Sequence, residues 1–310
     1  MGSSNVKFDD TRREVIVQAR YSERLLFAQF IGRENLDLSK TVSVAYRDTS
    51  LLPVSVALAL DASGFMGWDI EANRRPSESG LTGNTKMDAL KSAVKLLFTE
   101  IEGEVGGSDT LDAALRTGLA AYNDTLVSVS QFDNGRDHLS VSLAALQPGG
   151  STDTSVAMAE LHPDFLNDRN FRAATSSDFD PGRLREYVVL MTDGDNHVPN
   201  ADPNTLQLCA DMRADGIEVY TVAFAAPDKG RQLMLDCASW DADAGLPRGQ
   251  RGTVNRGCGD PGQSRCRENL HAADKSRYFF DATDADEMRD AFAAIGRDIS
   301  RNTGRVRIIR

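Results

Sequence analysis

A near-continuous apolar run, Val54–Leu60, interrupted only by Ser55, most constrains the fold that this chain can adopt. A strand buried on both faces reads as a near-continuous apolar run, which is typical of a parallel sheet covered by helices. The run leads directly into Asp61 and, two residues later, Ser63, followed by Gly64. Ligands of open α/β sheets bind at the carboxyl ends of such strands. The run therefore predicts a parallel strand that presents oxygen-bearing side chains where a ligand would bind.

Strands and helices are predicted to alternate along the rest of the chain. Lys86–Ile101 has apolar residues at helical spacing, and a second apolar strand, Tyr187–Met191, ends in Thr192-Asp193-Gly194. The other expected strands are 116–122, 126–132, 218–223 and 278–281, and the other expected helices are 152–160, 205–214, 229–239 and 284–299. This alternation predicts an α/β fold, a Rossmann-like doubly wound and mostly parallel sheet with helices on both faces.

The chain of 310 residues is expected to contain a large α/β domain and a small β-rich extension before it. Alternation of apolar and polar residues near the N-terminus indicates the extension, and Gly-, Asp- and Arg-rich stretches indicate loop insertions. The expected divisions are 1–12 as a tag or disordered start, 13–49 as the β-rich extension, 50–300 as the α/β domain with insertions at 67–85 and 241–276, and 301–310 as a C-terminal tail or edge strand.

Charge and hydropathy exclude some classes of partner. The formal net charge of −11 argues against nucleic acid, whose phosphates require a basic face. No apolar run approaches the roughly 18 residues that a membrane span needs. Membrane association is therefore expected only through a segment that is not in this chain.

The four cysteines, Cys209, Cys237, Cys258 and Cys266, all lie in the last third of the chain. They contain no Cys-x-x-Cys pair, so a zinc site is not expected. Two interpretations remain, four thiols or two disulfides in an oxidising compartment. The second is favoured because Cys258 and Cys266 lie in a loop that has little else to order it.

Three polar motifs resemble the metal-binding loops of von Willebrand factor A (vWA) domains, and they occur along the chain in the same order as in those domains. The first is Asp61-x-Ser63-x-Phe65, where vWA domains have Asp-x-Ser-x-Ser; the second is Thr152 after a Gly-rich turn; the third is Asp193 after an apolar strand. The resemblance implies that Ser63 and Thr152 bind a divalent cation directly, whereas Asp61 and Asp193 act partly through water. Oxygen ligands suit Mg²⁺, or Mn²⁺ or Ca²⁺ in its place.

Phe65 departs from the vWA pattern because it removes one hydroxyl ligand and adds a bulky ring. Two outcomes remain open. A water molecule replaces the missing hydroxyl and the site binds its cation more weakly, or the ring blocks the site and the fold carries no functional cation.

Further segments narrow the resemblance to the vWA domains of TadG-like Flp (tight adherence) pilus-assembly proteins of bacteria. They are Ile217–Phe224, Leu233–Ser239, Tyr278–Ala282 and Ala291–Gly296. The resemblance implies a membrane-anchored protein of the periplasm or cell surface, a protein partner that offers a carboxylate, and Cys209–Cys237 and Cys258–Cys266 disulfides. Charged residues near the motifs are expected to form the rim that meets the partner; they are Asp69, Glu71, Arg74, Arg75, Asp153 and Asp195.

The sequence favours a binding module over an enzyme. It has no Gly-x-Ser-x-Gly, His-Glu-x-x-His or phosphate-binding Gly-x-x-x-x-Gly-Lys motif. The expected function is a non-enzymatic module of a surface pilus or adhesion system that binds its partner through the cation. The alternatives are a scaffold with a vestigial metal site, whose long loops bind the partner, and a subunit of an intracellular ATP-driven chelatase, against which paired cysteines argue.

Overall fold

The computed structural model describes residues 2–9, 14–24, 35–45, 52–70, 85–103, 114–177, 179–239 and 277–303. The chain divides into two compact units, residues 51–303 and residues 1–50 together with 304–310. The expected insertion at 241–276 and most of the one at 67–85 lie outside the described residues.

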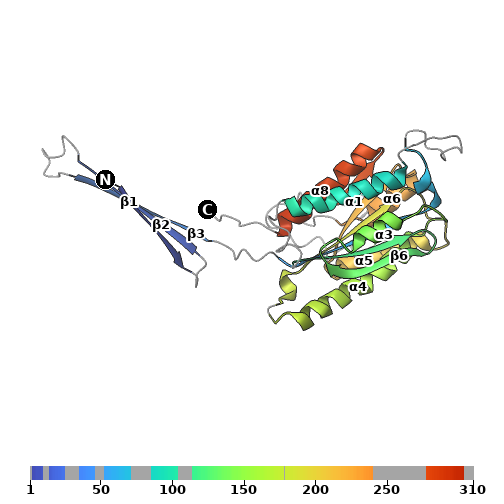
Figure 1. The fold of residues 1–310 in the computed structure, drawn as a ribbon, viewed down its shortest axis with the longest axis horizontal. Helices are drawn as coiled ribbons and strands as arrows, with labels where there is room; N and C mark the ends of the chain where they lie inside the picture. The colour runs from blue at the N-terminus through green and yellow to red at the C-terminus, as the bar shows by residue number, and fades with distance from the viewer. Residues whose placement is uncertain are drawn as a thin grey trace, which may run out of the picture. The chain divides into compact units, whose positions relative to one another are not determined.

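A six-stranded sheet with the order β6-β5-β4-β7-β8-β9 forms the centre of the larger unit (Figure 1). All neighbouring strands are parallel except β6, which pairs antiparallel with β5 at one edge. The strands are β4 (Val54–Asp61), β5 (Leu115–Tyr122), β6 (Leu126–Asn134), β7 (Arg185–Thr192), β8 (Glu218–Phe224) and β9 (Phe279–Ala282). The apolar run of β4 therefore lies inside the sheet, with a parallel neighbour on each side.

Helices cover both faces of this sheet. The helices are α1 (Lys86–Gly103), α3 (Leu139–Ala145), α4 (Thr154–Thr175), α5 (Ala201–Ala214), α6 (Asp228–Cys237) and α8 (Ala285–Thr303), with short 3₁₀ helices η2 (Gly64–Gly67) and η3 (Pro181–Arg183). Figure 1 shows α1 and α8 side by side on one face, with α4 on the other. The predicted doubly wound α/β fold is confirmed.

The side chains of β4 alternate between two hydrophobic cores. Val56 and Leu58 pack in the core that contains the apolar faces of α1 and α8. Ala57 and Ala59 belong to the core shared with α4, α5 and α6. All eight residues of β4 are buried, which explains why its sequence is apolar except for Ser55 and Asp61.

Helix α4 continues to Thr175, well beyond the predicted end at residue 160. Pro163 inside the helix favours an early end, since proline removes a backbone donor. Packing overrides this local preference, because Leu161 and Phe165 are buried in the core. The prediction also missed α3, which is only 7 residues long.

A buried ionic network anchors the second half of α4 to the sheet. Asp168 accepts hydrogen bonds from Arg116 Nε at 2.5 Å, from Arg172 Nε at 3.0 Å and from Ser55 Oγ at 2.5 Å. Arg172 Nη2 also donates to the carbonyl of Val54 at 2.8 Å. A buried carboxylate is tolerated when it is paired in this way. The network fixes α4 against β4 and β5.

The smaller unit contains an antiparallel sheet of β1 (Gly2–Asp9), β2 (Glu14–Arg24) and β3 (Asn35–Ala45), in that order. Strands β2 and β3 include the alternating stretches that predicted a β-rich extension. Strand β1 lies in the segment for which a tag or disordered start is expected. It pairs with β2 along its whole length, because the edge of β2 offers it a continuous row of backbone partners.

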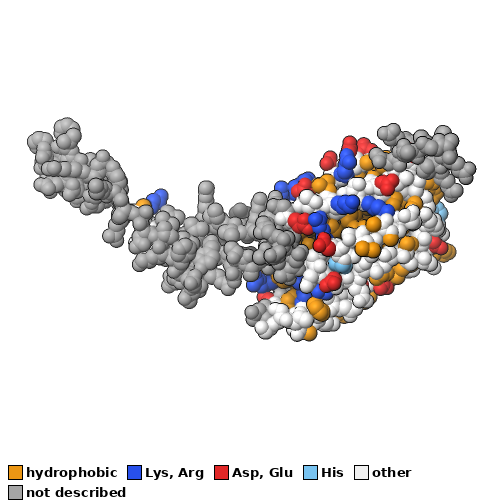
Figure 2. Space-filling view, in the orientation of Figure 1, with side chains coloured by type: hydrophobic (Ala, Val, Ile, Leu, Met, Phe, Trp, Pro, Cys, Tyr) orange, Lys and Arg blue, Asp and Glu red, His pale blue; other side chains and the backbone are white. Residues whose placement is uncertain are grey.

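Acidic and basic side chains are interspersed on the visible face of the larger unit, including the surface over α1 and α8 (Figure 2). Among the described residues, no helix combines the length and the hydropathy that crossing a membrane requires.

A disulfide joins Cys209 in α5 to Cys237 at the end of α6, with the Cα atoms 5.4 Å apart. Both cysteines are fully buried in the core that contains α4. The bond ties together two helices on one face of the sheet. Cys258 and Cys266 lie outside the described residues, so their pairing stays a prediction.

Replacing Cys209 and Cys237 together with alanine is expected to lower the free energy of unfolding by about 3 kcal/mol, because the bond closes a loop with a sequence separation of 28. Guanidinium unfolding of the oxidised protein and the variant measures the difference. Reduction of the wild-type protein should give a similar loss. A wild-type protein that unfolds at the same denaturant concentration with and without reductant would contradict this bond.

Candidate metal centre

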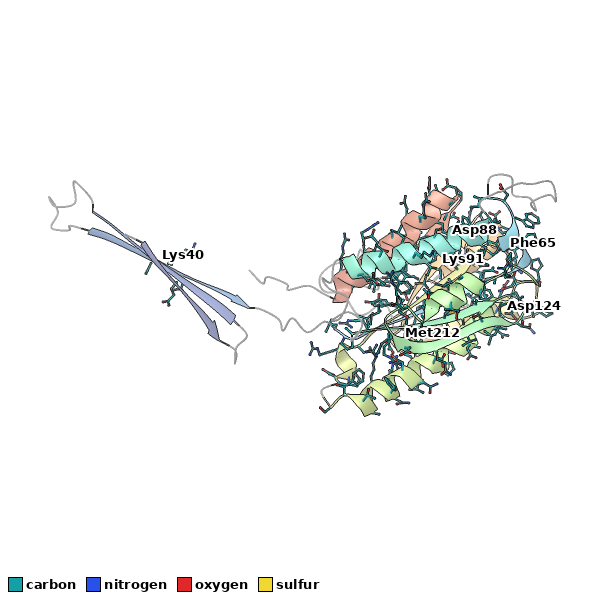
Figure 3. The ribbon with its side chains drawn as sticks, viewed as in Figure 1. Lys40, Phe65, Asp88, Lys91, Asp124 and Met212 are labelled. Carbon is teal, nitrogen blue, oxygen red and sulfur yellow. A yellow bond between two sulfur atoms is a disulfide. The ribbon has the colours of Figure 1, made fainter. Side chains whose placement is uncertain are left out.

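The three sequence motifs meet at one edge of the central sheet. Asp61 is the last residue of β4, and Asp193 directly follows β7. These strands are parallel neighbours, with Leu60 opposite Met191, so their carboxyl ends reach the same edge. Thr152 lies two residues before Thr154, the first residue of α4, and next to the N-cap residue Asp153. Figure 3 places Phe65 and Asp124 at this end of the larger unit.

Backbone hydrogen bonds tie the three loops to one another. Gly64 N donates to the carbonyl of Gly150 at 3.1 Å, and Gly149 N donates to Ala62 at 2.9 Å, which joins the first loop to the second. His197 N donates to Thr152 at 3.0 Å, which joins the third loop to the second. The loops therefore form one connected structure.

Gly150 has a positive φ of 75°, which favours glycine. A Cβ atom at this position would also lie 2.5 Å from Asn123 Nδ2. Asn123 Nδ2 donates to the carbonyl of Gly149 at 2.9 Å, so the Gly-rich turn is held against the end of β5. Glycine at position 150 is therefore required by the close approach of these two loops.

Asp61 organises the site from its centre. Its Oδ1 accepts a hydrogen bond from Ser63 N at 2.7 Å, and its Oδ2 accepts one from Thr192 Oγ1 at 2.7 Å. The carboxylate is fully buried, and burial raises its pKa, while these hydrogen bonds act in the opposite direction. Thr192 was not among the predicted site residues, although it stands directly before Asp193 in the third motif.

Three oxygen atoms at this edge lack a hydrogen-bond partner in the part of the chain that the structure describes. They are Ser63 Oγ, Thr152 Oγ1 and Asp193 Oδ1, and all three are buried. An unsatisfied buried polar atom costs about 1–3 kcal/mol, so such atoms are uncommon in native proteins. Their presence on three loops that converge indicates a ligand-binding position.

The donor set fits a hard divalent cation. Two hydroxyls and two carboxylates supply only oxygen, which Mg²⁺, Mn²⁺ and Ca²⁺ prefer. Among the described residues there is no cluster of three or more His, Cys, Asp or Glu that could hold a metal. A site here would therefore depend on hydroxyl groups as much as on carboxylates.

Lys86 is a further charged residue of the site, and the predictions did not include it. It is the first residue of α1, it is only 3% exposed, and its Nζ donates to Asp193 Oδ2 at 3.1 Å. Burial and the neighbouring Asp61 raise the pKa of Asp193 to about 7, while Lys86 opposes that rise. Lys86 precedes Leu90 by four residues and therefore lies on the same face of α1. A lysine on this apolar face is the sequence signal that could have indicated a buried positive charge.

Phe65 takes part in an aromatic cluster at the surface. Its side chain is 39% exposed, and its ring contacts Trp68 edge-on with the centroids 4.6 Å apart. The ring also stacks on His197 with a centroid distance of 6.4 Å. The expected third hydroxyl is thus replaced by a ring that has aromatic partners of its own.

The residues expected at the rim have different environments. Asp153 is 6% exposed and caps α4 by accepting a hydrogen bond from Ser155 N at 2.9 Å. Asp195 Oδ1 accepts one from Gly230 N at 2.7 Å, in the first turn of α6. Asp69 forms an isolated backbone bridge with Thr85. The remaining three, Glu71, Arg74 and Arg75, lie outside the described residues.

Comparison with known proteins identifies the larger unit. The family model described as "von Willebrand factor type A domain" matches residues 56–239, which is more than half of the chain. No curated protein matches the sequence.

Several solved structures are similar in fold. PilB minor pilin from Streptococcus sanguinis is 12% identical with a TM-score of 0.52, and the match covers 97% of this chain and 78% of that one. The pilus adhesin SpaC from Lactobacillus rhamnosus GG is 14% identical with a TM-score of 0.51, covering 97% and 34%. The vWF domain of the type V pili tip protein Mfa5 from Porphyromonas gingivalis is 13% identical with a TM-score of 0.50, covering 84% and 99%.

Gly230→Ala is expected to lower the free energy of unfolding by about 1–3 kcal/mol, because a Cβ atom there would clash with the carbonyl oxygen of Gly194 in the third loop. Urea unfolding measures the loss. Gly149→Ala is the matched control, since a Cβ atom at that position has nothing within 4 Å. Equal stability of the two variants would contradict the close approach of α6 to the third loop.

Proposed function

Because this chain belongs to the von Willebrand factor type A domain family, we propose that it is a non-enzymatic binding module that holds a divalent cation and, through it, a carboxylate of a partner protein. Ser63 and Thr152 are the proposed direct ligands, and Asp61 and Asp193 act partly through water. The observation that carries this proposal is the set of three buried oxygens without partners on three converging loops. The proposed ion is Mg²⁺, with Mn²⁺ or Ca²⁺ as substitutes.

Each residue has a distinct part in this proposal. Asp61 orients Ser63 by accepting its backbone N–H, and Thr192 fixes the other oxygen of the same carboxylate. Asp193 has one oxygen paired with Lys86, which leaves Oδ1 for the site. A cation bound here would have one open coordination position, and a carboxylate of the partner protein would fill it. At the position of Phe65, a water molecule replaces the missing hydroxyl.

We propose that the module works in a bacterial surface pilus or adhesion system, in the periplasm or at the cell surface, within the TadG-like Flp group. The disulfide between Cys209 and Cys237 supports an oxidising compartment. The similar structures include a minor pilin, a pilus adhesin and a pilus tip protein, which supports the same assignment at the level of the fold.

Phe65 favours a second candidate function, a scaffold whose metal site is vestigial. The ring replaces a hydroxyl ligand and is 39% exposed beside Trp68 and His197. In this case the partner is bound by surface loops. Metal titration separates the two functions.

The wild-type protein is expected to bind Mg²⁺ or Mn²⁺ at millimolar concentrations or below, and Thr152→Val is expected to weaken that binding at least about tenfold, because it removes a buried hydroxyl ligand. Isothermal titration after chelation measures both affinities. Thr99→Val is the matched control, because Thr99 Oγ1 donates to the carbonyl of Lys95 within α1 and lies outside the proposed site. If millimolar metal gives the wild-type protein neither heat nor a higher melting temperature, the scaffold function replaces the metal-dependent one.

Phe65→Ser is expected to tighten Mg²⁺ binding several-fold, since it supplies the hydroxyl that the vWA pattern has at this position. The same titration measures the gain. Phe171→Ser is the control, because Phe171 is also an exposed phenylalanine but lies in α4. This variant should keep the wild-type affinity for Mg²⁺. A Phe65→Ser variant with the wild-type affinity would show that residue 65 is outside the ligand shell.

A further inference from the structure

We infer that Lys86 is the resident counter-cation of the proposed metal centre, and that its charge makes the metal-loaded site require an anionic ligand. This inference rests on the proposed function, because it concerns the same site. It adds a residue that the vWA motif does not contain, and a reason why a carboxylate and not a neutral group completes the site.

The position of Lys86 is fixed by its surroundings. Its backbone N donates to the carbonyl of Trp68 at 3.0 Å, which ties the start of α1 to the first loop. Its Nζ bonds to Asp193 Oδ2 at 3.1 Å and lies 6.0 Å from the centroid of the Phe224 ring. The side chain is 4% exposed and that of Asp193 is 0% exposed, so water screens this pair little.

The charge of Lys86 changes the net charge of the metal site. When both carboxylates are ionised, Asp61 and Asp193 contribute two negative charges and Lys86 one positive charge, which gives the site without a metal a net charge of −1. A divalent cation changes this to +1. A net charge in a buried site is unfavourable, so one carboxylate that binds from outside restores neutrality. Without Lys86 the loaded site would be neutral and would gain much less from an anion.

The other acids near the site have partners that compensate them. Asp153 caps the N-terminus of α4, where the partial positive charge of a 22-residue helix faces it. Asp195 accepts a hydrogen bond from Gly230 N at the N-terminus of α6, and its charge also acts on Lys229. The charge balance of the ligand set therefore depends on Asp61, Asp193 and Lys86.

The first test compares the wild-type chain of 310 residues with Lys86→Met. The variant is expected to bind Mn²⁺ about tenfold more tightly or better, because a competing positive charge is gone. Its Mn²⁺ form is expected to bind acetate at least about tenfold more weakly than the wild-type Mn²⁺ form does. The measurement is the relaxation rate of water protons, which falls as acetate displaces water from the Mn²⁺ ion. Acetamide, which is neutral, should have little effect on either protein.

Lys91→Met is the matched control on the same helix. Lys91 Nζ donates to the carbonyls of Ala144 and Leu146 at 3.1 and 2.9 Å, and no carboxylate is among these partners. This variant should keep the wild-type affinities for Mn²⁺ and for acetate. Equal changes in both lysine variants would overturn the inference, since a general loss of positive charge would explain them.

A second test needs no metal and separates charge from packing. Measured at alkaline pH, which favours the ionised carboxylates, Lys86→Met is expected to lower the melting temperature of the metal-free protein by several degrees, because it leaves two buried carboxylates with no counter-cation. Adding Asp193→Asn restores the net charge of −1 and should recover much of that loss. If Lys86 acts only through packing, the double variant will be no more stable than the single one, and the inference fails.

The two tests distinguish a failure of this inference from a failure of the proposed function. A wild-type protein that binds no Mn²⁺ removes the proposed function and the anion requirement with it, while the metal-free melting temperatures still decide whether Lys86 is the counter-cation. A wild-type protein that binds Mn²⁺, with unchanged metal and acetate affinities in Lys86→Met, keeps the proposed function and overturns this inference.

Discussion

The parallel pairing of β4 with β7 is the interaction on which the rest of the site depends. It brings the carboxyl ends of two buried strands to one edge, and the hydroxyl of Thr192 then bonds across to Asp61 at 2.7 Å. The Gly-rich turn before α4 approaches the same edge through backbone hydrogen bonds to the loop after β4. The central strands thus stabilise the domain and also determine where the proposed ligands meet.

Buried charges are arranged differently at the two ends of β4. Near its start, Asp168 is paired with Arg116, Arg172 and Ser55, so both of its oxygens have partners. At its end, Lys86 is paired with Asp193 through Oδ2, and Asp193 Oδ1 has no partner among the described residues. The first network is complete within the protein and anchors α4. The second is incomplete among the described residues, which supports the proposed ligand site there.

The sequence predicted the class of the fold because strand and helix periodicity is a local property. Even so, the predicted helical segment covered only residues 152–160, whereas burial of Leu161 and Phe165 carries α4 past Pro163 to Thr175. Through the family resemblance, the sequence predicted that one site contains Asp61, Ser63, Thr152 and Asp193. The order and spacing of those motifs could not reveal Lys86, whose contact with Asp193 spans 107 positions in the chain.

The sequence by itself determined the alternation of strands and helices, the apolar core of β4 and the oxygen-bearing residues that follow it. Only the tertiary structure decided how those residues share their hydrogen bonds. It assigned Asp153 and Asp195 to helix N-termini, paired Lys86 with Asp193, and placed the Phe65 ring against Trp68 and His197. The physical reason is that periodicity depends on neighbours in sequence, whereas charge pairing and burial depend on which distant elements pack together.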